Sequence, residues 1–221
     1  MKAAVIGLGK IGLPIAITIA DAGIKVTGGD ASPKVVEEVN SGRAPFPGEP
    51  GLVEGIQRSL SSGLLRATTD NAEAAKNADI IVVIVPMYVD DQGIPDYSIL
   101  ESVSRDIGSV LHAGQTVIYE TTLPVGATRS RLAPILTEVS GLKAGHDFHV
   151  VHSPERVFSG RVFADLKRYP KIIGGLTPSC GDIAKDFYQQ VLVFDDRPDL
   201  DRLNGVWDLG SVEAAEFAKL A

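Results

Sequence analysis

Three glycines near the N-terminus have the spacing of a phosphate-binding turn. The stretch Gly7-Leu8-Gly9-Lys10-Ile11-Gly12 follows a strand-like apolar run and opens a helix-like one. In that setting the first glycine permits a tight turn, the second lets the backbone approach a pyrophosphate, and the third allows close helix packing. The N–H groups and positive dipole at the helix start then attract an anion. We therefore expect all six residues to contact a bound dinucleotide.

An aspartate follows the turn at about 20 residues, which is the spacing of the acid that binds adenosine ribose. Asp30 ends the second predicted strand, where a carboxylate can accept hydrogen bonds from both ribose hydroxyls. Its charge repels a 2′-phosphate, so the pattern favours NAD over NADP, although Lys34 is close enough in sequence to complicate that choice. Pro86, at the end of a later apolar run, is also expected to contact the cofactor. The structural alternative is a plain turn followed by a helix-capping aspartate.

Short β-branched runs alternate with helix-patterned segments along most of the chain. The predicted strands are Lys2–Gly7, Lys25–Gly29, Leu64–Thr68, Ile80–Pro86, Thr116–Glu120 and Phe148–Val151, and the clearest helices are Lys10–Ala22, Pro33–Ser41, Leu52–Ser61 and Gly126–Ser140. Parallel strands need long crossover connections, which helices fill. The pattern predicts an α/β fold of the Rossmann type, doubly wound, with a mainly parallel sheet.

The C-terminal third predicts an extension of the same sheet and then a change of organisation. Lys171–Gly175 and Val191–Phe194 are predicted strands, with a helix near Ser179–Gln190 between them. We expect an NAD-binding domain over 1–194, a linker rich in Asp, Pro and Gly over 195–210, and the first turns of an interdomain helix over 211–221. Ser211 is the predicted N-cap of that helix, with Glu213 in its first turn. The helix reaches Ala221 without a capping residue, so we expect a longer protein with a C-terminal domain.

Composition argues against several classes of protein. The 221 residues are 44% hydrophobic and 22% charged, as in an ordinary folded domain. A net charge of −7 argues against a general nucleic-acid partner, which needs many Lys and Arg on phosphates. No apolar run reaches the ~20 residues that span a bilayer, and no signal-peptide pattern is visible, so no membrane partner is expected. A single cysteine and histidines without metal-ligand spacing predict no metal site and a cytoplasmic location.

Several stretches, in order along the chain, resemble the UDP-glucose/UDP-N-acetylmannosamine 6-dehydrogenase family of nucleotide-sugar dehydrogenases. They are Gly7–Pro14 with Asp30, Asn40-Ser41-Gly42, Glu49-Pro50-Gly51-Leu52, Glu120-Thr121-Thr122-Leu123-Pro124-Val125-Gly126, Ser153-Pro154-Glu155-Arg156, and Glu213-Ala214-Ala215-Glu216-Phe217-Ala218-Lys219-Leu220. No single stretch would be sufficient to indicate this family. Their order and spacing over nearly the whole chain make the resemblance specific.

The resemblance implies an enzyme that oxidises the C6 alcohol of a UDP-sugar to a carboxylate with two NAD+, through an enzyme-bound thioester. It implies that Thr122 and Glu155 lie beside the nicotinamide and the reacting carbon, where they position water and shuttle protons. Lys219 is expected to stabilise oxyanion character on the reacting oxygen. The sugar nucleotide is expected to contact four residues: Glu155, Arg156, Arg161 and Lys219.

Each of these residues also has a plain structural interpretation. Thr122 could be a β-former beside a turn, and Glu155 could be a solvated loop acid. Lys219 lies three residues after Glu216, so an exposed ion pair between them would explain it. All three residues, however, stand at positions that match the family motifs, and they follow a glycine-rich turn typical of NAD binding. This combination favours the catalytic interpretation.

Arg156 bears on the identity of the sugar. The residue after this glutamate is usually aromatic in UDP-glucose dehydrogenases and usually arginine in enzymes acting on UDP-N-acetylmannosamine or UDP-N-acetylglucosamine. The resemblance therefore favours a 2-acetamido sugar, with UDP-glucose as the alternative. It also implies that the full-length protein forms a homodimer.

The thiol that the family uses to capture the aldehyde is expected beyond residue 221. Cys180 is a poor substitute, because it follows a predicted helix start at Thr177-Pro178 and a structural role is the commoner one for such a cysteine. We therefore expect the chain to bind NAD but to turn over little by itself. A β-hydroxyacid-type dehydrogenase and a non-catalytic NAD-sensing module remain as alternatives.

Overall fold

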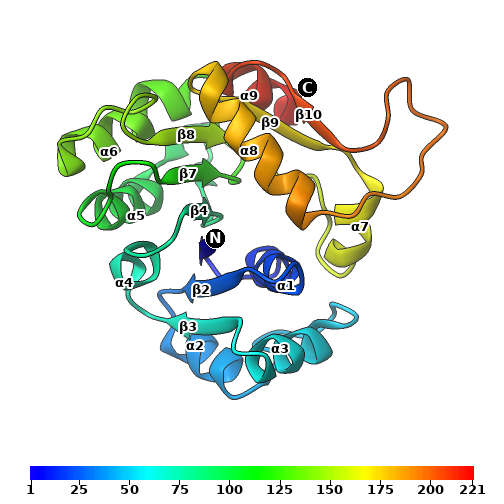
Figure 1. Ribbon diagram of the computed structural model, residues 1–221. Helices are drawn as coiled ribbons and strands as arrows, with labels where there is room; N and C mark the ends of the chain where they lie inside the picture. The colour runs from blue at the N-terminus through cyan, green and yellow to red at the C-terminus, as the bar shows by residue number, and fades with distance from the viewer.

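An eight-stranded sheet forms the centre of the protein in the computed structural model, which describes residues 1–221 (Figure 1). The strand order is β10-β9-β8-β7-β4-β1-β2-β3. The strands are β1 Lys2–Ile6, β2 Lys25–Gly29, β3 Leu65–Thr68, β4 Ile80–Val83, β7 Thr116–Tyr119, β8 His149–His152, β9 Lys171–Gly175 and β10 Val206–Asp208. Neighbours from β3 to β8 pair in parallel, whereas β9 is antiparallel to β8. The predicted Rossmann-type, mainly parallel sheet is confirmed.

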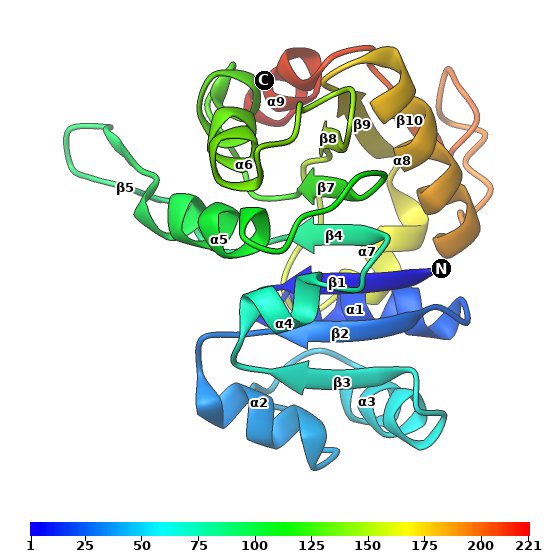
Figure 2. The same ribbon diagram turned by 60° about the vertical axis from the view of Figure 1, so that its left-hand side comes forward.

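Helices cover both faces of this sheet (Figure 2). They are α1 Gly12–Asp21, α2 Pro33–Asn40, α3 Leu52–Ser61, α4 Asn71–Ala75, α5 Ser98–Gly108, the π-helical turn η1 Thr128–Leu132, α6 Ala133–Ser140, α7 Val162–Arg168, α8 Pro178–Val191 and α9 Val212–Leu220. A small hairpin of β5 Tyr88–Val89 and β6 Pro95–Asp96 projects from the body. No helix combines the length and the apolar character needed to cross a bilayer.

Alternate residues of the central strands enter two separate hydrophobic cores. Val5 and Val82 pack with α1 and α8 on one face, while Ile6 and Val83 pack with α5 and α6 on the other. Strands buried on both faces need continuous apolar sequences, which explains why β1 and β4 were easy to predict.

The prediction of a strand at Val191–Phe194 was wrong. Val191 is the last residue of α8, and the next three residues form no strand. Val191 and Leu192 are buried against the first core, but the side chain of Val193 is 76% exposed. The apolar run at 191–194 therefore reflects packing of the C-terminal end of α8 against the core.

The prediction that 195–210 is entirely a linker was also wrong, because Val206–Asp208 form the edge strand β10 beside β9. Asn204 further ties the preceding loop to the protein by donating hydrogen bonds to the carbonyls of Lys167, Arg168 and Asp195. A strand of three residues between polar segments is too short to show a period in the sequence.

The glycines of the first turn are required by close packing. Gly7 has φ +100°, and a Cβ built there would lie 2.7 Å from the carbonyl oxygen of Ile84. A Cβ on Gly12 would lie 1.8 Å from the carbonyl oxygen of Gly7, whereas one on Gly9 would meet nothing within 4 Å. Two of the three glycines therefore serve the fold, and the third faces open space.

A buried ion pair lies at the carboxyl end of β7. The Lys171 ammonium is 2.9 Å from Glu120 Oε2, with 7% and 0% of the two side chains exposed. The Tyr188 hydroxyl donates a hydrogen bond to Glu120 Oε1, and Lys171 Nζ lies 4.6 Å from the centre of the tyrosine ring. Burial, followed by the nearby negative charge of Glu120, raises the pKa of Tyr188. The three side chains therefore form one buried polar cluster.

We expect Gly12→Ala to destabilise the protein by about 1–3 kcal/mol, because the new methyl group overlaps the backbone of the turn. Gly9→Ala is the matched control, and its free energy of unfolding should change by less than about 0.5 kcal/mol. Urea denaturation measures both. Equal stability of the two variants would contradict the packing described here.

We expect Lys171→Met to lower the free energy of unfolding by about 3–5 kcal/mol, because it leaves the Glu120 carboxylate buried without its cation. Arg58→Met removes an exposed pair with Asp21 and should cost less than about 1 kcal/mol. Denaturant titrations of both variants test the difference. A smaller loss in Lys171→Met than in Arg58→Met would refute the structural role of the buried pair.

Candidate functional site

The predicted site residues follow strands that end at one edge of the sheet. The Gly7–Gly12 turn follows β1, Asp30 follows β2, Pro86 follows β4, Thr122 follows β7, and Glu155 follows β8. These strands are parallel, so their carboxyl ends meet at that edge. The strand order reverses between β1 and β4, and such a switch point opens a crevice for ligands in doubly wound sheets.

The glycine-rich turn and Asp30 are in direct contact. Asp30 Oδ2 accepts a hydrogen bond of 2.8 Å from the Leu8 N–H, and Oδ1 accepts one of 2.9 Å from the Ser32 N–H. The N–H groups of Gly9, Lys10, Ile11 and Gly12 donate no hydrogen bond within the protein. Unpaired donors at the start of α1, beside the open space at Gly9, fit a bound pyrophosphate.

Side-chain contacts connect this turn to the loop that carries Thr122. Thr121 Oγ1 donates a hydrogen bond of 2.6 Å to the carbonyl of Val85, which directly precedes the exposed Pro86. Ile84, one residue earlier, donates its N–H to the carbonyl of Ile6, directly before the turn, at 2.9 Å. Thr122 is half-buried between the buried Thr121 and Leu123, and its hydroxyl makes no hydrogen bond within the protein. A free hydroxyl at this edge is available to a ligand.

Glu155 and Lys219 meet, although they are far apart in the sequence. Lys219 Nζ donates hydrogen bonds of 2.6 Å to the Glu155 carbonyl and 3.1 Å to its Oε1. The two side chains are only 20% and 24% exposed. The Glu155 N–H also bonds to the Glu120 carbonyl at 3.2 Å, which holds the loop after β8 against the end of β7. A cation and a carboxylate are therefore placed together beside the Thr122 loop.

The alternative pairing of Lys219 with Glu216 does not occur. Glu216 is fully buried, and its carboxylate accepts hydrogen bonds from the N–H groups of Gly126 and Thr128. Burial raises the pKa of Glu216, while these donors act in the opposite direction. Sequence reasoning missed this role, and the only available signal was the position of Glu216 inside a recognised motif.

The two arginines differ in how they are held. Arg161 Nε lies 3.0 Å from Oδ2 of the buried Asp165, and the guanidinium stacks 4.8 Å from the centre of the Phe158 ring. Arg156 is half-buried and makes no hydrogen bond or ion pair within the protein. Both arginines belong to the arginine loop, residues 153–161, which connects β8 to α7. Glu49, from another recognised motif, holds this loop by accepting a hydrogen bond of 2.9 Å from the Gly160 N–H.

Cys180 and two histidines lie outside this group of contacts. Cys180 is fully buried, with its sulfur 3.1 Å from Thr177 Oγ1 and 3.6 Å from His149 Nδ1. Pro178 occupies the first turn of α8, with Thr177 as the N-cap residue, as predicted. Burial, with a smaller contribution from the positive charge of Lys171, lowers the pKa of His152 to about 3, so this imidazole is neutral.

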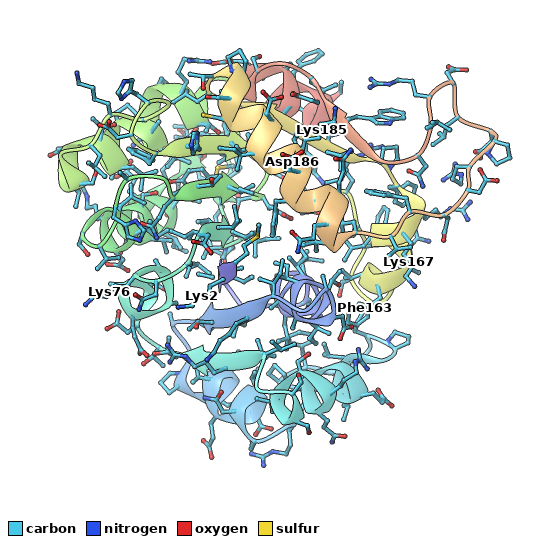
Figure 3. All side chains as sticks on the ribbon, viewed as in Figure 1. Lys2, Lys76, Phe163, Lys167, Lys185 and Asp186 are labelled. Atoms are coloured by element: carbon cyan, nitrogen blue, oxygen red, sulfur yellow. The ribbon has the colours of Figure 1, made fainter.

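One cavity lies away from the predicted site. It measures about 560 Å³ and is lined by α1 at Thr18 and Asp21, near the C-terminal end of that helix. Phe163 and Lys167, labelled in Figure 3, line it from α7. The glycine-rich turn is at the opposite end of α1, so this cavity is separate from the predicted cofactor site.

Known proteins resemble this chain over most of its sequence. Residues 1–192 match the family described as the UDP-glucose/GDP-mannose dehydrogenase family, NAD binding domain. The chain is 39% identical over 191 residues to UDP-N-acetyl-D-mannosamine dehydrogenase of Pyrococcus horikoshii, an alignment covering 86% of this chain and 44% of that protein.

Solved structures are similar over the whole chain. UDP-D-ManNAc dehydrogenase from Pyrococcus horikoshii gives a TM-score of 0.89 at 34% identity, over 100% of this chain and 49% of that one. A ternary complex of GDP-mannose dehydrogenase from Pseudomonas aeruginosa gives 0.88 at 28% identity, over 100% and 48%. The chain spans about half the length of these relatives. The resemblance seen in the motifs is confirmed: the chain belongs to the UDP-glucose/GDP-mannose dehydrogenase family and corresponds to its NAD-binding domain.

Proposed function

We propose that this domain works in an enzyme that oxidises the C6 alcohol of a UDP-sugar to a carboxylate with two NAD+. The preferred sugar is a 2-acetamido sugar such as N-acetylmannosamine. The contact of Lys219 with Glu155 carries the proposal, because it brings a cation of α9 to an acid at the edge where the glycine-rich turn lies. Arg156 beside that acid and the name of the Pyrococcus horikoshii relative support the choice of sugar.

The Gly7–Gly12 turn and Asp30 would hold NAD, and Pro86 would line its path toward the reacting carbon. The unpaired N–H groups at the start of α1 suit the pyrophosphate, and Asp30 Oδ2, already directed at the turn, suits the ribose hydroxyls. When bound, NAD+ supplies the hydride acceptor. The protein supplies orientation and charge.

Glu155, Lys219 and Thr122 would act on the substrate alcohol. A half-buried carboxylate such as Glu155 can hold a water or accept a proton from it, and the Thr122 hydroxyl can both donate and accept. Lys219 would stabilise negative charge on the C6 oxygen. Arg156, free of internal partners, is suited to bind the sugar nucleotide, while Arg161 would use the N–H groups that its pair with Asp165 leaves free.

The proposal includes a homodimer that acts in the cytoplasm. Phe217 and Leu220 are 61% and 53% exposed on α9, and an apolar helix face of this kind suits contact with a second copy. The single buried cysteine is compatible with a reducing compartment.

The full-length protein should form two NADH for each UDP-N-acetylmannosamine consumed, at a higher kcat/KM than with UDP-glucose or GDP-mannose. Absorbance of NADH with a panel of nucleotide sugars measures this. A preference for UDP-glucose would overturn the choice of sugar. Tight NAD binding without formation of NADH from any nucleotide sugar would overturn the proposed enzymatic activity and favour an NAD-sensing module.

Asp30→Asn should weaken NAD binding by roughly tenfold to a hundredfold, because a charged acceptor for the ribose hydroxyls is lost. The preference for NAD over NADP should also narrow, since the carboxylate no longer repels a 2′-phosphate. Calorimetric titration of both nucleotides measures these changes, with Asp21→Asn, at the far end of α1, as the control. Unchanged NAD affinity in Asp30→Asn would remove Asp30 from the cofactor site.

A further inference from the structure

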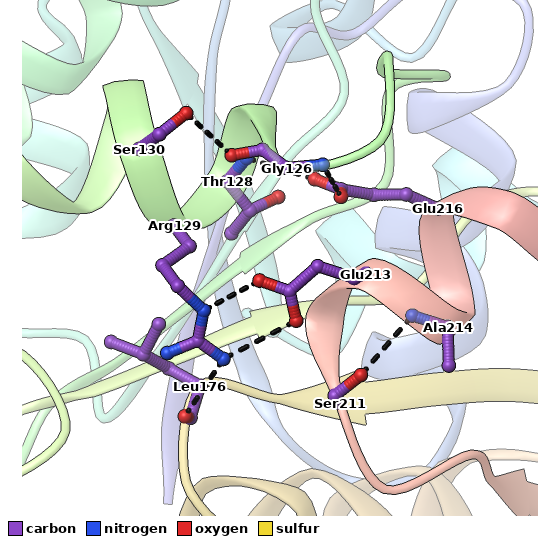
Figure 4. Close-up of polar contacts among 9 residues, drawn as sticks. All are labelled: Gly126, Thr128, Arg129, Ser130, Leu176, Ser211, Glu213, Ala214 and Glu216. Carbon is purple, nitrogen blue, oxygen red and sulfur yellow. Dashed lines mark hydrogen bonds and ion pairs between the residues drawn. The ribbon is translucent and has the colours of Figure 1, made fainter.

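Glu216 connects two segments that carry proposed catalytic residues. The Gly126 N–H donates to its Oε2 at 2.6 Å and the Thr128 N–H donates to its Oε1 at 2.8 Å (Figure 4). The donors and the acid are about 90 residues apart in the sequence, and no part of the Glu216 side chain reaches solvent. Both carboxylate oxygens are thus committed to the backbone of another segment.

Glu216 accepts hydrogen bonds from Thr128, the first residue of η1, and from Gly126, which lies two residues before it. A helix leaves its first N–H groups without internal partners, so the Thr128 N–H needs an acceptor from outside the helix. The residue before η1 makes no side-chain cap, so the capping carboxylate is supplied by α9. A charged acceptor at a helix N-terminus also benefits from the helix dipole. This contact is therefore stronger than an ordinary surface contact between two segments.

The contact fixes α9 against the loop that carries Thr122. Thr122 lies four residues before Gly126, and Lys219 lies three residues after Glu216, on the next turn of α9. Lys219 reaches back to Glu155 in the loop after β8. Glu216 thereby sets where the lysine stands relative to both loops.

We propose that Glu216 is a positioning residue, which holds the Lys219 ammonium in register with Thr122 and Glu155 through the N–H groups of Gly126 and Thr128. This inference rests on the proposed function for the roles of those three residues. Glu216 itself touches neither substrate nor cofactor in this proposal, and its effect is exerted through the placement of its neighbours. Small errors of placement at a reacting centre can reduce a rate by about a hundredfold.

Glu213 provides a matched comparison on the same helix. Its carboxylate pairs with Arg129 at 2.5 Å, and the two side chains are 34% and 48% exposed (Figure 4). Arg129 in turn donates to the Leu176 carbonyl at 3.4 Å. Exposed pairs contribute little to stability, so loss of this one should leave α9 in place.

The test compares Glu216→Gln with Glu213→Gln in the full-length enzyme. Glu216→Gln should lower kcat by about tenfold to a hundredfold. The NAD dissociation constant should stay within about twofold, because the glycine-rich turn and Asp30 are untouched. Hydrogen exchange of the Gly126 and Thr128 amides should become faster in this variant alone. Glu213→Gln should leave kcat within about twofold of wild type.

Two outcomes of the activity measurements would overturn the positioning role. One is a kcat in Glu216→Gln equal to that in Glu213→Gln. The other is a parallel fall in kcat, NAD affinity and unfolding midpoint, which would indicate general loss of structure. Failure of the wild-type enzyme to form NADH with any nucleotide sugar would count against the proposed function itself. Unchanged amide exchange in Glu216→Gln would count against the contact.

Discussion

Parallel pairing of the central strands is the constraint on which the rest of the structure depends. β1 pairs with β2 and β4, and β7 joins β4 to β8, all in parallel. Because these strands are buried on both faces, a register shift by one residue would exchange the residues of the two cores. The register is therefore fixed, and the five loops that follow these strands meet at one edge.

Buried acidic side chains hold these loops in defined positions. Glu120 is held by Lys171 and Tyr188, and Glu216 is held by two backbone N–H groups. Asp165 likewise secures the arginine loop. A buried charge without partners is costly, so each acid strongly favours the one loop geometry that satisfies it. The loops gain rigidity from groups that need not take part in any reaction.

Local features were predictable because they depend on neighbours in the sequence. The limits of β2, α3 and β9 agree with prediction, since β-branched runs and amphipathic periods are properties of short windows. The cap at Ser211 was predictable for the same reason, and its Oγ accepts the Ala214 N–H. Short or irregular elements such as β10 and η1 carry too little pattern, and their existence depends on what they pack against.

The sequence by itself determined the α/β class, the glycine-rich turn and the position of Asp30, because backbone sterics and strand length impose those spacings directly. Only the tertiary structure decided that Lys219 pairs with Glu155, 64 residues away, while Glu216, on the same helix, faces inward to Gly126 and Thr128. The partner of a charged side chain depends on which segments surround it after folding. That environment sets the cost of burial and the available donors, and neither quantity is local to the sequence.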